Sequence, residues 1–196
     1  MTEARTSLEL AGRTIPTPPL GQATLVLIDY QNEYCEGPLK LVGVEAAIGP
    51  AEALLHAGRR AGARIHHVAH KGAPGGLFDR AQRRGDFIDA LKPAQGEAIV
   101  EKTFASAFAG TELETLIGPA GSAVVFAGFM THNCVSSTVR GGIERGYTMT
   151  VAADACATRD LPLAGGVVPA AEIHAAELAG LGDAHAAIRT VAEIAG

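Results

Sequence analysis

Three residues of complementary chemical types stand near the ends of short apolar runs in the sequence. Asp29 and Lys102 each follow directly on such a run, and Cys134 lies six residues beyond Gly128, where a third run ends. A carboxylate can accept the proton of a thiol, and an ammonium can hold the negative charges of such a site in register. Taken singly, the three would be a turn residue, a surface lysine and an inert buried thiol. Taken together, they predict a nucleophilic site.

The segment GFMTHNCVSST places Cys134 after a turn and at the start of a helical pattern. Thr131 or Asn133 can cap that helix through a side-chain oxygen. The positive end of a helix dipole favours a thiolate over a thiol, so we expect Cys134 to be the nucleophile. Cys35 and Cys156 lie in loops without such a context, and we expect them to be structural.

The elements that must hold these residues alternate between two patterns. Continuous apolar runs rich in Val and Ile are typical of strands covered on both faces, as in a parallel sheet. These runs are Ala23–Ile28, Arg64–Ala69, Ala98–Glu101, Ala123–Ala127 and Thr148–Ala152, with Ala186–Ile194 as a weaker sixth. Helical periodicity lies between them, at Ile48–Arg60, Val135–Ile143 and Ile173–Leu181. The alternation predicts an α/β fold, a three-layer αβα sandwich around a mainly parallel, six-stranded sheet.

The predicted organisation is an N-terminal arm over residues 1–20, ending in three prolines, and a single domain over 21–196. In such sheets, ligands bind beyond the carboxyl ends of the strands, where Asp29 and Lys102 lie. The stretch Lys71–Gln95 fits neither pattern, and a loop of that length usually forms a lid or a wall of a site.

Composition narrows the function classes. The 196 residues carry a net charge of −5, which argues against a nucleic-acid surface. No segment approaches the ~18 apolar residues of a membrane span, and charges interrupt the N-terminus where a signal peptide needs an apolar core. Three cysteines without a CxxC pair suggest neither a disulfide framework nor a zinc knot. We expect a cytoplasmic protein with a small-molecule substrate and without a membrane or nucleic-acid partner.

Four segments in this order resemble the isochorismatase-like cysteine hydrolases, the superfamily that includes nicotinamidases and N-carbamoylsarcosine amidases. They are ATLVLIDYQNEY, GEAIVEKTFASAF, GFMTHNCVSSTVR and DACATRDLP. The family's strand-ending Asp with its Gln-Asn pair matches Asp29, Gln31 and Asn32. Its Lys before Ser-Ala-Phe matches Lys102, and its nucleophile matches Cys134.

The resemblance implies hydrolysis of an amide or similar C–N bond through a thioester, with Asp29, Lys102 and Cys134 as the catalytic triad. It also implies a cis peptide between Phe129 and Met130. The backbone N–H groups of Met130 and Cys134 are then expected to form the oxyanion hole.

No metal ion and no other cofactor is expected. The nicotinamidase branch holds a divalent ion with an Asp-x-His element after the second strand, where this chain has Ala69, His70 and Lys71. His66 and His67 also alternate between the two faces of a strand, which leaves at most His66 and His70 on one side.

Substrate-binding candidates beside the site loops are His70, Phe104, Phe108 and His132, with Phe78 as a further wall residue. Each is equally compatible with ordinary packing. No arginine is obviously positioned to bind a substrate carboxylate in bidentate fashion, and Arg159, in the loop after the fifth strand, is the nearest candidate. The sequence does not identify the substrate.

Two alternatives remain open. The alternatives to an amide hydrolase are a non-catalytic or redox-sensing member of the fold with a low-pKa Cys134, and a hydrolase of non-amide small molecules. The vinyl-ether cleavage of isochorismatase itself is disfavoured, because that enzyme lacks the cysteine. By resemblance we also expect a homo-oligomer, a dimer or tetramer. Gly141 and Gly142 within one predicted helix indicate a close approach there, either to the sheet or to a second subunit.

Overall fold

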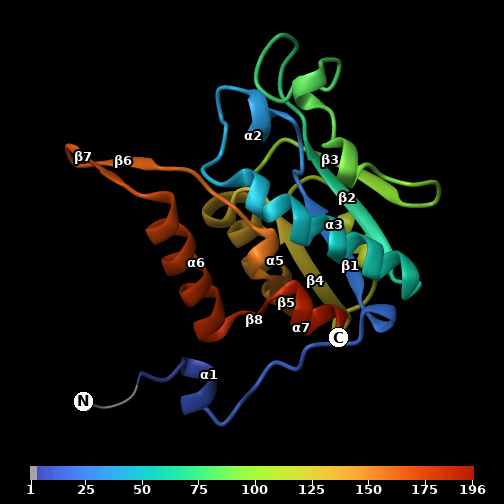
Figure 1. The fold of residues 1–196 in the computed structure, drawn as a ribbon. Helices are drawn as coiled ribbons and strands as arrows, with labels where there is room; N and C mark the ends of the chain where they lie inside the picture. Colours follow the sequence, from blue (N-terminus) through green and yellow to red (C-terminus); the bar gives the residue numbers. More distant parts are fainter. Residues whose placement is uncertain (1–3) are drawn as a thin grey trace.

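Six parallel strands form the centre of the computed structural model, which describes residues 4–196 (Figure 1). The strand order is β3-β2-β1-β4-β5-β8. The strands are β1 (Thr24–Ile28), β2 (Arg64–His70), β3 (Ala98–Lys102), β4 (Ala123–Gly128), β5 (Thr148–Ala152) and β8 (Ala187–Arg189). Every neighbouring pair runs parallel, so all the carboxyl ends meet at one edge of the sheet.

Helices cover both faces, which confirms the predicted three-layer sandwich. On one face lie α3 (Val44–Arg60) and α7 (Val191–Ala195), and on the other α4 (Leu113–Ile117), α5 (Ser136–Glu144) and α6 (Ala170–Ala184). The shorter elements are α1 (Ser7–Leu10), α2 (Glu33–Glu36), η1 (Leu20–Gln22), η2 (Arg83–Gly85), η3 (Asp89–Leu91), η4 (Thr131–Val135), η5 (Ala153–Ala155) and the hairpin β6 (Leu161–Leu163) and β7 (Gly166–Val168).

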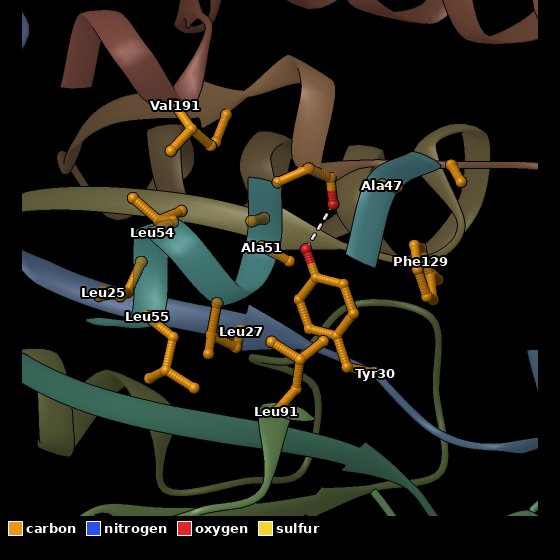
Figure 2. Packing of buried hydrophobic residues seen from close by; sticks show 14 of the residues in the cluster. Leu25, Leu27, Tyr30, Ala47, Ala51, Leu54, Leu55, Leu91, Phe129 and Val191 are labelled. Carbon is orange, nitrogen blue, oxygen red and sulfur yellow. Dashed lines mark hydrogen bonds between the residues drawn. The ribbon is translucent and has the colours of Figure 1, made fainter. Parts of the chain in front are cut away.

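The continuous apolar run of β1 serves two cores at once. Leu25 and Leu27 pack under α3 against Leu54 and Leu55 (Figure 2). Val26 and Ile28 point to the opposite face and join the core under α5 and α6. Successive side chains of a strand point to opposite faces, so a strand covered on both sides needs apolar residues at every position. Each fully buried leucine stabilises the fold by roughly 1.5–3 kcal/mol relative to exposure.

Only part of the weaker sixth run forms a strand, β8. Pairing with β5 ends at Arg189, and the chain then begins α7, with Thr190 and Glu193 forming a capping box. The predicted strand over Ala186–Ile194 is therefore wrong beyond Arg189. Apolar residues near the end of the chain continue as helix because the capping pair satisfies the first backbone N–H groups.

The close approach predicted at the glycine pair in α5 is between Gly142 and the sheet. A Cβ on this residue would lie 2.3 Å from Cε of Met149 on β5. The glycine thus lets the helix pack against the sheet within one chain.

The long segment between β2 and β3 is fastened to the carboxyl edge of the sheet. Gln31 Nε2 donates to the carbonyl oxygens of His70 and Gly85, at 3.0 and 2.8 Å. Asn32 Nδ2 donates to the carbonyl oxygens of Arg83 and Phe87. The segment has only the short turns η2 and η3, and these bonds hold it beside the strand end that carries Asp29.

The chain before β1 contacts α6. Ser7 donates its backbone N–H and its hydroxyl to the Asp183 carboxylate, each at 2.8 Å. Across residues 4–196, no helix combines the length and the apolarity needed to cross a membrane.

Candidate active site

Asp29 is the first residue beyond β1, and its side chain is completely buried. Its φ of +54° lies in the left-handed region that non-glycine residues rarely adopt. Its backbone N–H donates to Val68 O on the neighbouring strand at 2.9 Å, which fixes this turn to the sheet. A buried carboxylate needs a partner, and the structure supplies one from two strands away.

That partner is Lys102, the last residue of β3. Its Nζ lies 2.7 Å from Asp29 Oδ2 and 3.2 Å from Cys134 Sγ. The same ammonium donates to Phe104 O at 3.2 Å and lies 3.3 Å from His70 Nδ1. Four groups around one ammonium fix its position. Burial lowers the pKa of Lys102, but the Asp29 carboxylate and the contact with the Cys134 sulfur outweigh burial, so the pKa is raised and the ammonium stays cationic.

Cys134 lies in η4, a π-helical turn between β4 and α5, and is 2% exposed. The predicted start of a regular helix at Cys134 is off by two residues, since the π-helical turn runs directly into α5, which starts at Ser136. Neither Thr131 nor Asn133 caps α5. Thr131 Oγ1 instead donates to Ala157 O at 3.2 Å and lies 2.9 Å from His174 Nδ1 on α6. The peptide between Phe129 and Met130 is cis.

The thiol is held in its protonated form. Burial and the negative charge of Asp29 raise the pKa of Cys134 to about 12, and Lys102 only partly opposes them. The expectation that this turn favours a thiolate is therefore wrong for the resting site, because burial and the Asp29 carboxylate together outweigh the Lys102 ammonium. Among residues 4–196, no N–H or O–H group other than the ammonium partners the Asp29 oxygens, so the Cys134 thiol is the donor left for them.

The same groups form a potential metal-ligand set. Asp29, His70 and Cys134 offer ligand atoms that all lie within 4.8 Å of one another. The Lys102 ammonium lies within 3.3 Å of each of the three, so a cationic group already occupies the space between them. A metal ion held by these donors would have to displace it.

Each of the four substrate-binding candidates lies in a different kind of position. His70 contacts the ammonium, and burial and Lys102 lower its pKa, so it is a neutral member of the site. The side chain of Phe104 is 63% exposed, with only its carbonyl oxygen in the cluster. His132 Nδ1 hydrogen-bonds to Thr158 Oγ1 at the rim, and its pKa is lowered by burial and by Arg159.

Phe108 does not join this group. Its ring is buried in the core, stacked 5.9 Å from Tyr147 and beneath the Arg145 guanidinium. The Ser-Ala-Phe segment thus supplies packing for α5 at this position, and the expectation that Phe108 contacts substrate is wrong.

Two residues beside the site were not predicted as part of it. Tyr34 on α2 lies five residues after Asp29, with its ring 5.7 Å from Phe129, the residue before Met130. His174 supports the nucleophile turn through Thr131.

Comparison with known proteins identifies the family of the chain. The isochorismatase domain family matches residues 23–193. A secreted isochorismatase effector of Verticillium dahliae is 41% identical over 144 residues, covering 71% of this chain and 75% of that protein. The maleamate amidohydrolase of Pseudomonas putida is 29% identical over 145 residues, covering 65% and 68% of the two chains.

The fold agrees equally well. The crystal structure of an isochorismatase from Pseudomonas putida superimposes with a TM-score of 0.92 at 41% identity, covering 98% of this chain and all of that one. The family domain spans nearly the whole chain, including all three residues of the Asp29, Lys102 and Cys134 cluster. The chain therefore belongs to the isochorismatase family of hydrolases.

Proposed function

We propose that this protein hydrolyses an amide, or a similar C–N bond, of a small molecule through a thioester on Cys134. One observation carries the proposal. A buried ammonium lies 2.7 Å from the Asp29 carboxylate and 3.2 Å from the Cys134 sulfur, which joins a proton acceptor and a nucleophile in one enclosed site. Such a pairing is the general arrangement of an activated nucleophile.

The first half-reaction forms the thioester. As substrate binds, the Asp29 carboxylate takes the thiol proton while the sulfur attacks the carbonyl carbon. Collapse of the tetrahedral intermediate breaks the C–N bond, and protonated Asp29 gives its proton to the departing nitrogen. The resting thiol with its high pKa suits this sequence, because the proton leaves only when a carbonyl is present to accept the electron pair of the sulfur.

The second half-reaction returns the enzyme to its resting state. Asp29 takes a proton from water, the resulting oxygen nucleophile attacks the thioester, and the carboxylic acid product leaves as the thiol regains the proton. Lys102 stays cationic throughout. Its charge keeps Asp29 ionised before attack and stabilises the sulfur whenever it carries negative charge.

The developing oxyanion needs hydrogen-bond donors. We assign this role to the backbone N–H groups of Met130 and Cys134. The Met130 N–H supports this assignment, because it has no hydrogen-bond acceptor within residues 4–196 and so is available to a substrate oxygen. One such donor contributes about 3–4 kcal/mol to transition-state stabilisation in comparable sites.

Ammonia release from small primary amides tests the proposal, beginning with maleamate, the substrate named for one relative. We expect turnover by the wild type, its loss in Cys134→Ser, and a reduction of about 10²–10⁴-fold in Asp29→Asn. A thioester-forming enzyme should also show acylated Cys134 by intact-protein mass after rapid acid quenching. Turnover that survives Cys134→Ser would overturn the mechanism.

The redox-sensing alternative is disfavoured by the same thiol. Oxidation by peroxide requires thiolate character and exposure, whereas Cys134 is 2% exposed with a pKa of about 12. A hydrolase of non-amide substrates would use the same residues, and an ester such as monomethyl maleate in the screen separates it from an amidase.

A further inference from the structure

A buried phenol beside the nucleophile lacks a hydrogen-bond partner. Tyr34 is 1% exposed, yet within residues 4–196 no group bonds to its hydroxyl. Its oxygen is also not among the fully enclosed unpaired atoms, unlike both oxygens of Asp29, so it borders an open space. Tyr30, four residues earlier in the chain, has a hydroxyl that is paired, as is usual for a buried phenol. Its hydroxyl donates to Ala155 O in the core, as the dashed line in Figure 2 shows.

The ring of Tyr34 is held between two walls of the site. It lies 5.1 Å from Phe78 and 5.7 Å from Phe129. Phe78 in turn lies 5.0 Å from His70, which contacts the Lys102 ammonium. These contacts leave the ring little freedom, so the hydroxyl has a fixed direction next to the catalytic cluster.

Burial and the neighbouring groups keep the Tyr34 hydroxyl protonated. Burial raises the pKa of Tyr34 well above its ordinary value, and the charges of Asp29 and Cys134 raise it further. Arg159 acts in the opposite direction on the same phenol and also lowers the pKa of His132. The phenol is therefore a hydrogen-bond donor within electrostatic reach of the nucleophile and of Arg159.

Arg159 is a second donor without a partner. Its Nε is buried and has no hydrogen bond within residues 4–196. The chain two residues earlier is fixed to the nucleophile turn, because Ala157 O accepts the N–H of Thr131 at 3.0 Å. Buried donors are nearly always paired in native proteins. The buried Arg159 Nε without an acceptor, together with the Tyr34 hydroxyl that borders an open space, therefore indicates a ligand that supplies the acceptor.

We propose that the Tyr34 hydroxyl and the Arg159 guanidinium form a subsite that binds a carboxylate of the substrate beside Cys134. The proposal rests on the function proposed above and deepens it by naming a substrate class, small amides that carry an anionic group. A neutral amide would leave both donors unpaired, and a site built to hydrogen-bond its substrate discriminates strongly against analogues that lack the acceptor.

A pair of alkylating reagents tests this subsite without the natural substrate. Iodoacetate carries a carboxylate and iodoacetamide does not, and both alkylate thiols. We would measure the ratio of their rates at Cys134, divided by the same ratio at the half-buried Cys35 in the same molecule, by peptide mass. Tyr34→Phe should lower the normalised ratio about 10-fold, since it removes a hydrogen bond to a charged group. Tyr30→Phe is the matched control and should leave it unchanged.

Thermal unfolding distinguishes a ligand-binding hydroxyl from a structural one, because the two roles predict different changes in Tm when the hydroxyl is removed. Tyr34→Phe should leave the Tm unchanged or raise it, because the lost hydroxyl had no partner, whereas Tyr30→Phe should lower it. Maleate, the dicarboxylate that maleamate hydrolysis yields, should raise the Tm of the wild type and not that of Tyr34→Phe.

The results separate failure of the subsite from failure of the proposed function. An unchanged alkylation ratio in Tyr34→Phe, or a Tm lowered as in Tyr30→Phe, would overturn the subsite even if amides are hydrolysed. If Cys134 reacts with neither reagent and no amide is cleaved, the proposed function fails. The maleate shift then still decides the subsite, since its absence in the wild type contradicts it and its loss in Tyr34→Phe supports it.

Discussion

Asp29 has opposite effects on the resting thiol and on the reaction, and alkylation kinetics can separate them. Its charge helps to raise the pKa of Cys134 to about 12, whereas Lys102 lowers that pKa. Asp29→Asn should therefore lower the pKa and speed iodoacetamide labelling of Cys134 at pH 8, while it slows amide hydrolysis. Lys102→Met should raise the pKa further and slow the labelling.

Cys35 and Cys156 serve as internal references in this experiment. Burial raises the pKa of both thiols, but neither contacts the Asp29–Lys102 pair, so neither rate should change in the two variants. If Asp29→Asn slowed labelling of Cys134, the carboxylate would be promoting ionisation of the resting thiol, and the protonated ground state would be wrong.

At the scale of residues, the sequence was sufficient to predict which groups meet but not their charge states. Asp29, Lys102 and Cys134 follow from their residue types at strand ends, since parallel strands bring those ends to one edge. The pKa of the thiol depends on its distance from Asp29 and on its burial, which only the folded chain defines. Phe108 was misplaced for a similar reason, because an aromatic residue beside a site loop looks the same whether it faces the site or the core.

The packing of α5 on the sheet gives a prediction at the scale of elements. A Cβ at Gly142 would lie 2.3 Å from Cε and 2.9 Å from Sδ of the fully buried Met149. Gly142→Ala should therefore lower the free energy of unfolding by about 1–2 kcal/mol, because overpacking outweighs the gain in helix propensity. Chemical denaturation of the purified variant measures this change.

The adjacent Gly141 is the matched control. A Cβ there meets no atom closer than Ser106 Oγ at 3.2 Å, a contact that a small shift relieves. Gly141→Ala should be neutral or stabilising by up to about 1 kcal/mol. Equal destabilisation by both substitutions would mean that α5 needs flexibility there, and that contact with Met149 is not the reason for the glycine.

The strands were otherwise predictable, because a strand that is buried on both faces is apolar at successive positions. Five of the six runs became strands within a residue of their expected ends. The exceptions have local causes that a pattern of apolar residues does not reveal. Val191–Ala195 is helical because Thr190 and Glu193 cap it, and η4 is a π-helical turn whose Thr131 bonds to a distant helix in place of capping its own.

At the scale of the whole molecule, one partly buried carboxylate joins three separate segments. Glu97, just before β3, accepts from Arg59 on α3 at 2.7 and 2.9 Å, and its Oε2 lies 2.7 Å from His67 Nε2 on β2. The Ala94 N–H also donates to it at 2.8 Å. Burial alone would raise the pKa of Glu97, but these hydrogen bonds outweigh burial and lower the pKa to about 2.

This shift predicts how the stability of the fold depends on pH. Because the folded pKa lies below the value of about 4.5 for the unfolded chain, the ionised Glu97 stabilises the fold fully above about pH 4.5, and this contribution declines as pH falls toward 2. Urea unfolding of the wild type and Glu97→Gln should show a difference that is about 2 kcal/mol smaller at pH 3 than at pH 7. Glu101→Gln removes surface ion pairs with Lys71 and Arg80 and should change stability by less than about 1 kcal/mol at either pH. A Glu97→Gln difference that stays constant with pH would show that this carboxylate holds the three segments together by shape and not by charge.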